Sequence, residues 1–285
     1  MKTTKKVFAL ILTLIMIAAC FAGCSNSSEE KYSDSVLIIG YTDSVEPFLT
    51  VDENGKATGF EADVFEAIFN DVKGDLKSYV FEKVEPGYEL EQSGGFTDLT
   101  GKEYSAGLLL GAVSKNDGTF NEDYSFTEPL ITNRVIAVTA NGSDIKSYAD
   151  LAGKKAIVVG DTAKTAFESQ SQISSSCSDI SEESDAESAL KALDNGNADV
   201  VIIDEFTYMP LNLGDSYTVL SGELDSIEYV FACAKNSGWK DSLNEAIREM
   251  KSESYGNGDE FTPLVEKYFG YNASSFDYET EAAGN

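Results

Sequence analysis

The chain has 285 residues, which suits one large or two ordinary domains, and 42% of them are hydrophobic, enough to build real cores. Its formal net charge of −28 argues against DNA or RNA as a partner, because so acidic a surface repels nucleic-acid phosphates. The absence of histidine excludes His-based catalytic triads and imidazole zinc sites.

The N-terminal segment has the pattern of a secretory signal. A short basic stretch, "MKTTKK", precedes an apolar run, "VFALILTLIMIAA", of the expected length. Small residues before a cysteine and a Ser/Asn-rich stretch after it resemble the lipobox of bacterial lipoproteins. By that resemblance residues 1–23 form a signal peptide, Cys24 is acylated, and residues 24–33 form a flexible tether. Cys20 is the alternative acylation site, and an uncleaved membrane anchor is the other interpretation, although the apolar run is short for a span.

The segments after the tether begin with a strand, a hairpin and a helix. The short apolar run at 35–40 predicts a buried strand, and Asn54-Gly55 between extended flanks predicts a hairpin with a type I′ turn. Residues 60–72 predict an amphipathic helix, because four apolar side chains share one face: Ala62, Phe65, Ile68 and Phe69.

Strand patterns follow at 78–84, 106–113 and 133–140. Between the first two, the Gly-rich and polar stretch 85–105 predicts a loop with room for a short helix.

A second strand–helix series starts near residue 155. The strand 155–160 leads into a helix that Asp161 or Thr162 can cap. A further helix aligns Ala186, Ala189, Leu190 and Leu193, stops at Gly196, and precedes a strand at 200–203. The last elements are a strand at 228–235, helices within 241–254 and 260–270, and a frayed tail at 272–285. This alternation predicts an α/β fold with largely parallel sheets.

Two cysteines, Cys177 and Cys233, lie in this part of the chain. Outside the cytoplasm they can form a disulfide, and two separate buried thiols are the alternative. No Cys/His cluster, EF-hand spacing or phosphate-binding loop is present, so no metal and no cofactor is expected.

Five segments, in order from residue 37 to residue 270, resemble the solute-binding proteins of ABC importers for polar amino acids. They are "LIIGYTDSVEPFLTVDENGKATGFEADVFEAI", "SFTEPL", "DLAGKKAIVVGDTAKTAF", "ALKALDNGNADVVIIDE" and "KNSGWKDSLNEAIREMKSESYGNGDEFTPLVEKYFG". The resemblance implies a two-lobed periplasmic-binding-protein-like fold, in which each lobe is a mainly parallel sheet flanked by helices. It implies lobe one at 34–132 and 230–271, lobe two at 133–229, and closure around a ligand by a hinge motion.

The resemblance also implies a ligand-contacting strand end, which we call the lip, formed by Gly111, Ala112, Val113 and Ser114. The family's arginine, which grips a ligand carboxylate, falls near Phe120 here and is missing. Lys115 and Arg134 are candidate replacements, and a solvated lysine with a surface arginine is the alternative interpretation.

On the other lobe, Thr162 matches a family residue where a helix N-terminus offers N–H groups to a ligand carboxylate, unless Asp161 only caps that helix. Asp204 matches the family's acceptor for the ligand ammonium. A carboxylate at the carboxyl end of a buried strand also faces the usual binding crevice of α/β proteins, although a helix cap or surface charge is possible there.

The first loop adds Glu46 and Phe48 beside Val45, which replaces a family aromatic residue, and Glu61 matches an acidic residue that is structural or at the cleft edge in the family. The sequence keeps Asp204, the expected acceptor for a ligand ammonium, and lacks the arginine that would bind a ligand carboxylate. This difference favours an amine-bearing ligand. The resemblance implies a monomeric, lipid-anchored, non-enzymatic protein on the outer face of the bacterial membrane, with an ABC permease as partner. The alternatives are a ligand-sensing or degenerate binding protein and a dehydratase-like enzyme on the same fold.

Overall fold

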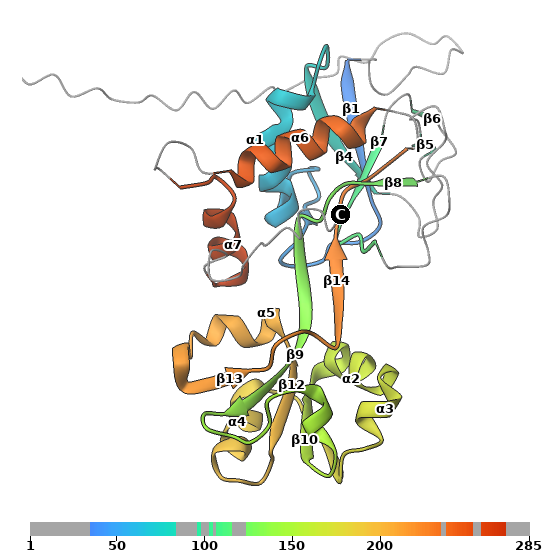
Figure 1. Ribbon diagram of the computed structural model, residues 1–285. Helices are drawn as coiled ribbons and strands as arrows, with labels where there is room; N and C mark the ends of the chain where they lie inside the picture. Colours follow the sequence, from blue (N-terminus) through green and yellow to red (C-terminus); the bar gives the residue numbers. More distant parts are fainter. Residues whose placement is uncertain are drawn as a thin grey trace, which may run out of the picture. The chain divides into compact units, whose positions relative to one another are not determined.

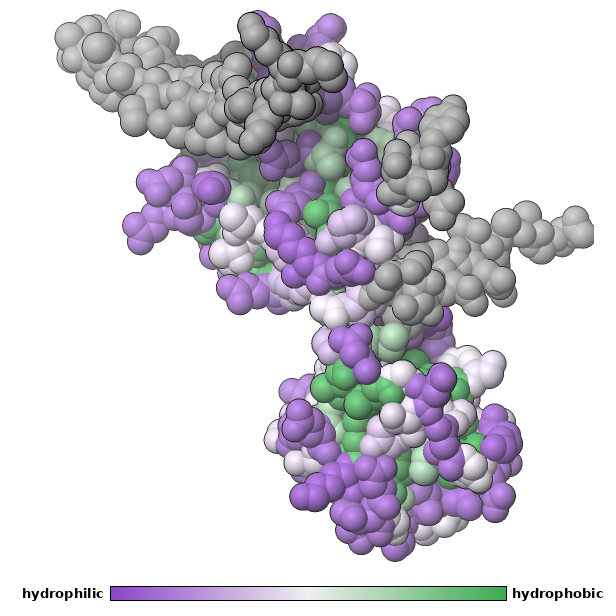
Figure 2. All heavy atoms as spheres, turned by 90° about the vertical axis from the view of Figure 1, so that its left-hand side faces the viewer, coloured by the Kyte–Doolittle hydropathy of each residue, from purple (hydrophilic) through white to green (hydrophobic). Residues whose placement is uncertain are grey.

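The computed structural model describes residues 35–83, 96–97, 103–104, 107–115, 124–234, 238–252 and 258–271, and two β-sheets organise them (Figure 1). The predictions for the signal peptide, the tether, the C-terminal tail and most of 85–105 lie outside these residues. On the face in Figure 2, hydrophilic residues cover much of the surface, as the acidic composition predicts.

The first sheet has the strand order β4-β1-β7-β15-β8 and joins early and late parts of the chain. Its strands are β1 (Val36–Tyr41), β4 (Ser78–Lys83), β7 (Gly107–Leu110), β8 (Tyr124–Phe126) and β15 (Ala232–Ala234). β1 is parallel to β4 and β7, whereas β15 is antiparallel to β7 and β8. Its core includes residues from the helices α1 (Phe60–Val72), α6 (Trp239–Lys251) and α7 (Thr262–Phe269).

The second sheet has the order β11-β10-β12-β9-β13, with β14 paired to β9. Its strands are β9 (Ile131–Ala140), β10 (Lys155–Val159), β11 (Asp179–Glu183), β12 (Val200–Asp204), β13 (Tyr217–Val219) and β14 (Asp225–Tyr229). The accompanying helices are η1 (Tyr148–Leu151), α2 (Gly160–Ser169), α3 (Ser171–Ser174), α4 (Ala186–Asp194), α5 (Glu205–Tyr208), η2 (Met209–Leu211) and η3 (Gly214–Ser216). β10 is parallel to β11 and β12, and β9 is antiparallel to its three partners, so both sheets are mixed.

Side chains of the second sheet alternate between two cores. Ala156 and Val158 of β10 join the core that contains α2, whereas Ile157 and Val159 join the core that contains α4. Burial on both faces explains why β10 after Lys155 and β12 before Asp204 contain only apolar residues. The four aligned residues of α4 are all buried, which confirms that helix, and α1 has the predicted bounds.

The predicted strand 228–235 is wrong as a single element. β14, which lies beside β9 in Figure 1, ends at Tyr229, and β15 starts at Ala232 in the first sheet. The two residues between them bond elsewhere, since Val230 N–H donates to Val113 O and Phe231 N–H donates to Thr127 Oγ1. The chain therefore changes sheets where the sequence shows one continuous apolar run.

The hairpin at Asn54-Gly55 forms between β2 (Thr50–Val51) and β3 (Ala57–Thr58), but its turn is not type I′. Gly55 has a positive φ of 76°, whereas Asn54 does not. The Asp52 carboxylate accepts the N–H groups of Asn54 and Lys56, which stabilises a longer turn.

The predicted loop with room for a helix contains strands instead. In the described part of 85–105, β5 (Phe96–Thr97) pairs with β6 (Glu103–Tyr104). The sequence there has no regular spacing of apolar residues that would indicate strands, so the pairing of β5 with β6 could not be predicted from it.

Candidate functional site

Asp204 lies at the carboxyl end of β12 and is also the N-cap of α5. Its Oδ1 accepts from Asn133 Nδ2 at 3.0 Å and Thr207 N–H at 3.2 Å, and its Oδ2 accepts from Thr207 Oγ1 at 2.8 Å. The residue is 9% exposed. The carboxylate is thus held by neutral donors, so it caps a helix and still presents a negative charge at a strand end.

Asn133 of β9 positions this carboxylate and was not singled out by the sequence analysis. Its Nδ2 donates to Asp204, and its Oδ1 accepts from Phe206 N–H at 3.2 Å. The available signal was an amide side chain near the start of the strand "ITNRVIAVTA", where Asn133 is buried.

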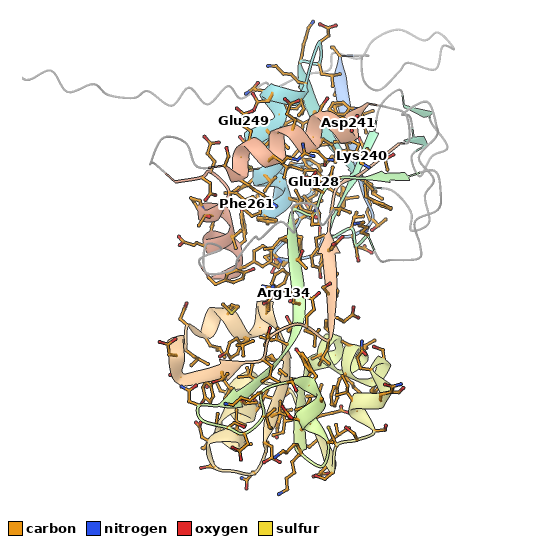
Figure 3. The ribbon with its side chains drawn as sticks, in the orientation of Figure 1. Glu128, Arg134, Lys240, Asp241, Glu249 and Phe261 are labelled. Atoms are coloured by element: carbon orange, nitrogen blue, oxygen red, sulfur yellow. The ribbon has the colours of Figure 1, made fainter. Side chains whose placement is uncertain are left out.

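Arg134, on β9 in Figure 3, contacts protein carboxylates. Its Nε donates to Glu205 Oε2 at 2.8 Å, and Glu223 Oε2 lies 3.9 Å away. Burial raises the pKa of Glu205, and the arginine opposes that increase. Lys115 likewise donates to Glu228 Oε2 at 2.8 Å. Both candidate replacements for the missing carboxylate clamp are therefore engaged within the protein.

The lip bonds to a buried glutamate. Gly111 N–H donates to Glu61 Oε2 at 2.6 Å, and Ala112 N–H donates to Glu61 Oε1 at 3.0 Å. Further along the lip, Val113 O accepts from Val230 N–H, and Ser114 forms a β-bridge with Tyr229. The N–H groups of Gly111 and Ala112, which the sequence analysis placed among the ligand contacts, are therefore already bonded to Glu61.

Phe48 belongs to the core, since it is 5% exposed and packs against several aromatic rings. Glu46 is exposed, as is Val45, which forms a bridge with Leu49.

Thr162 is exposed in the first turn of α2. The prediction that Asp161 or Thr162 caps this helix is wrong, because the helix starts at Gly160 and its N-cap is Val159, with no side-chain cap. Only the residue before the first helical position can cap in that way.

Tyr229, at the end of β14, connects the lip with Phe48. It bridges to Ser114, and its ring centroid is 4.3 Å from that of Phe48. Burial raises the pKa of Tyr229, and the charges of Asp204 and Glu61 raise it further. Tyr229 therefore contacts both the lip and Phe48, and the charge of Asp204 acts on its pKa, whereas Glu46 and Thr162 are exposed. Sequence analysis placed Tyr229 in a strand without assigning it a role.

The possible disulfide is ruled out, because Cys177 and Cys233 are both free thiols. Burial raises the pKa of Cys233 to about 12, so this thiol stays protonated and inert. Across the described ranges, no group of three or more Cys, Asp or Glu side chains is placed to hold a metal ion. No helix in the described part of the chain is both long and apolar enough to cross a membrane.

The fold is periplasmic-binding-protein-like, with two mixed sheets and flanking helices. The model of the bacterial extracellular solute-binding proteins, family 3, matches residues 37–271, and the chain belongs to this family.

The chain shares 18–34% sequence identity with the individual relatives described next. The chain is 23% identical to the L-cystine-binding protein TcyA of Bacillus subtilis, over 96% of this chain and 100% of TcyA. It is 34% identical to the probable amino-acid-binding protein YxeM of Bacillus subtilis, over 52% of each chain. A solved structure of the L-cystine solute receptor of Neisseria gonorrhoeae, unliganded and open, shares the fold with a TM-score of 0.56 and 18% identity, covering 84% of this chain and 95% of that one.

Proposed function

We propose that this protein captures an amino acid or another small amine-bearing solute outside the cytoplasm and delivers it to an ABC transporter permease, without catalysing a reaction. Membership of the solute-binding family supports capture, and the names of TcyA and YxeM support an amino acid as the solute class. The observation that carries the proposal is Asp204, a buried carboxylate at a strand end that neutral groups hold in place.

The charge balance around the site favours an ammonium group on the ligand. An ammonium would supply the opposite charge that the donors to Asp204 lack. Arg134 and Lys115 pair with Glu205 and Glu228, so neither guanidinium nor ammonium group is held ready for a ligand carboxylate. Strong, specific binding of glutamate or aspartate would contradict this ligand class.

The cores support the proposed lobes. One core draws its residues from 37–131 and 231–271, and the other two draw theirs from 135–224. We therefore keep lobe one at 34–132 and 230–271 and lobe two at 133–229. Acylation at Cys24, or at Cys20, would tether a monomer to the outer face of the cell membrane.

A thermal-shift screen of residues 25–285, which contain all three cores, tests the proposal. The ligands are the standard amino acids, L-cystine, polyamines and short peptides. A ligand that binds only the folded state stabilises it by about 2.7 kcal/mol at a hundredfold excess over Kd. We expect an amine-bearing ligand to raise the melting temperature and acidic amino acids to have little effect.

Asp204→Asn tests the key contact with the least disturbance. An asparagine side chain can keep the bonds to Asn133 and Thr207, because the Thr207 hydroxyl can accept as well as donate, so mainly the charge is lost. We expect the ligand-induced shift to disappear. Thr207→Val is the control, since it removes a hydrogen bond to Asp204 and keeps the charge. Unchanged binding by Asp204→Asn would contradict the assigned role.

A sensing or degenerate binding protein is the second candidate. The observation that favours it is the pairing of both candidate clamp cations with protein carboxylates. If no ligand in the screen stabilises the protein, this function becomes the better explanation.

A further inference from the structure

Glu61 is a buried acid for which the proposed function has no use. It is the second residue of α1, its side chain is fully buried, and its carboxylate bonds to the backbone of the lip. Burial raises the pKa of Glu61 to about 7, and the two lip N–H groups oppose that increase. Tyr229 is the titratable group whose pKa this carboxylate raises.

Such a carboxylate is costly for a core, because a buried charge without a cation loses its hydration. An apolar side chain in the first turn of α1 would avoid this cost. The compensation lies in the geometry, since each carboxylate oxygen accepts one N–H group, at 2.6 Å from Gly111 and 3.0 Å from Ala112. Charge-assisted bonds of this kind are stronger than bonds between neutral groups.

The lip has a backbone shape that it does not favour by itself. Gly111 has φ of 109°, and Ala112 has φ of 56°. The left-handed region costs a residue with a Cβ about 1–2 kcal/mol. Among the described residues, Ala112 is one of two non-glycine residues with positive φ. Hydrogen bonds from outside the lip can offset this cost, and the Glu61 carboxylate accepts both of these N–H groups.

The helix end that carries Glu61 is fixed in turn to the first loop. Phe60 N–H donates to Pro47 O, and Glu61 N–H donates to Phe48 O, both at 2.9 Å. Gly59 packs so closely that a Cβ there would lie 2.4 Å from Phe48 O. Glu61 thus connects two segments of the predicted site, the first loop and the lip.

We propose that Glu61 is a positioning residue: its buried carboxylate fixes the backbone of Gly111 and Ala112, and so gives the lip the shape that receives the ligand. Glu61 does not itself touch the ligand. The effect on binding rests on the proposed function, whereas the effect on the lip does not.

Glu61→Gln tests the proposal with little change in side-chain volume. A glutamine amide has one oxygen and one NH2 group, so one of the two lip N–H groups, which point at different carboxylate oxygens, would face a donor. We expect the amide hydrogen exchange of Gly111 and Ala112, followed by NMR in residues 25–285, to accelerate by about tenfold or more. We expect the affinity for the most stabilising amino acid of the screen to fall by about tenfold. Glu66→Gln is the matched control, because Glu66 is exposed on the same helix.

The outcomes distinguish the anchoring of the lip by Glu61 from the effect of that anchoring on ligand binding. Unchanged exchange at Gly111 and Ala112 would overturn the anchoring role, and faster exchange with unchanged affinity would overturn the positioning role. If no ligand of the screen binds the wild-type protein, the proposed function fails, and the exchange result still decides whether Glu61 anchors the lip.

A wild-type measurement covers the case in which Glu61→Gln does not fold. The amide resonances of Gly111 and Ala112 should shift together with pH, with a midpoint near 7, as their acceptor takes up a proton. Tyr229 titrates above its ordinary value of 10 and does not interfere. Resonances that do not respond to pH anywhere in the range over which the protein stays folded would overturn the proposal, whereas a midpoint away from 7 would change only the pKa of Glu61.

Discussion

Two buried glutamates, each in the first turn of a helix beside the candidate site, are stabilised in different ways. Glu61 of α1 bonds to the backbone N–H groups of Gly111 and Ala112. Glu205 of α5 bonds to the Arg134 guanidinium. Burial is the largest cause of a raised pKa in both. The first glutamate is therefore sensitive to backbone shape, whereas the second depends on an opposite charge.

The difference follows from what each glutamate holds. A carboxylate that accepts two backbone N–H groups fixes the direction of a chain segment, because neither donor can rotate away. An ion pair constrains position less, since a long arginine side chain can follow its partner. Substitutions around Glu61 should thus act through steric fit, and those around Glu205 through charge.

Gly59→Ala should have the largest effect on stability. Gly59 has φ of 120° and ψ of 174°, a region essentially restricted to glycine, and an added Cβ would lie 2.4 Å from Phe48 O. We expect a loss of about 4 kcal/mol in the free energy of unfolding, measured by urea denaturation. Gly142→Ala is the control: its φ of 81° is also positive, but a Cβ there meets nothing within 4 Å, so about 1 kcal/mol is expected. Equal losses would contradict the steric argument.

The pH dependence of stability should identify Glu61. Its pKa rises from an ordinary 4.5 to about 7 on folding, so the folded chain binds this proton more tightly than the unfolded chain. The stabilisation is present below pH 4.5 and is lost as the pH rises through 7. Relative to Glu61→Gln, the wild-type protein should lose on the order of 3 kcal/mol over that window, at 1.36 kcal/mol per pH unit.

Urea denaturation of both proteins at several pH values measures this difference, in which the other carboxylates cancel. A difference that does not change between pH 4.5 and 7.5 would show that Glu61 titrates normally.

Arg134→Met should cost less, about 2 kcal/mol, through charge. It leaves the Glu205 carboxylate, 6% exposed, without its cation. Removal of one partner of a buried pair costs about 3–5 kcal/mol, and the value is lower here because Arg134 is 35% exposed. The double variant Arg134→Met with Glu205→Gln removes the unpaired charge, so urea denaturation should show a recovery of much of the loss. No recovery would mean that Arg134 stabilises the protein through packing.

Local sequence patterns predicted the positions of helices and strands better than they predicted which strands pair with one another. The helix at 60–72 and the buried face of α4 follow from apolar spacing within a few turns. The change of sheet after Tyr229 does not, because the flanking residues are equally apolar and only their distant partners differ.

The candidate site shows the same limit. The position of Asp204 at a strand end could be inferred from neighbouring residues alone. Its bond to Asn133 and the pairing of Arg134 with Glu205 each join residues 71 positions apart, and the bond between Glu61 and Gly111 joins residues 50 apart. The sequence predicted which residues could bind a ligand. Contacts between distant residues determine which of these side chains are already bonded to other parts of the protein.

Arg248→Met should have the smallest effect and gives the sharpest contrast with Arg134→Met. Arg248 of α6 donates through Nε to both carboxylate oxygens of Glu128, at 2.9 and 3.1 Å, and Glu128 lies beside α6 in Figure 3. Both side chains are largely in water, with 63% and 44% exposed, so water replaces the lost partner.

The turn that carries Glu128 has other attachments to α6: Glu128 N–H donates to Asn244 Oδ1, and Lys251 Nζ donates to Pro129 O. We therefore expect no resolvable change in the urea midpoint for Arg248→Met, and no further change at high salt. For Arg134→Met the midpoint should fall at both salt concentrations, because a pair that is partly buried is screened less than an exposed one. Similar losses for the two arginines would refute the view that burial of the carboxylate sets the strength of these pairs.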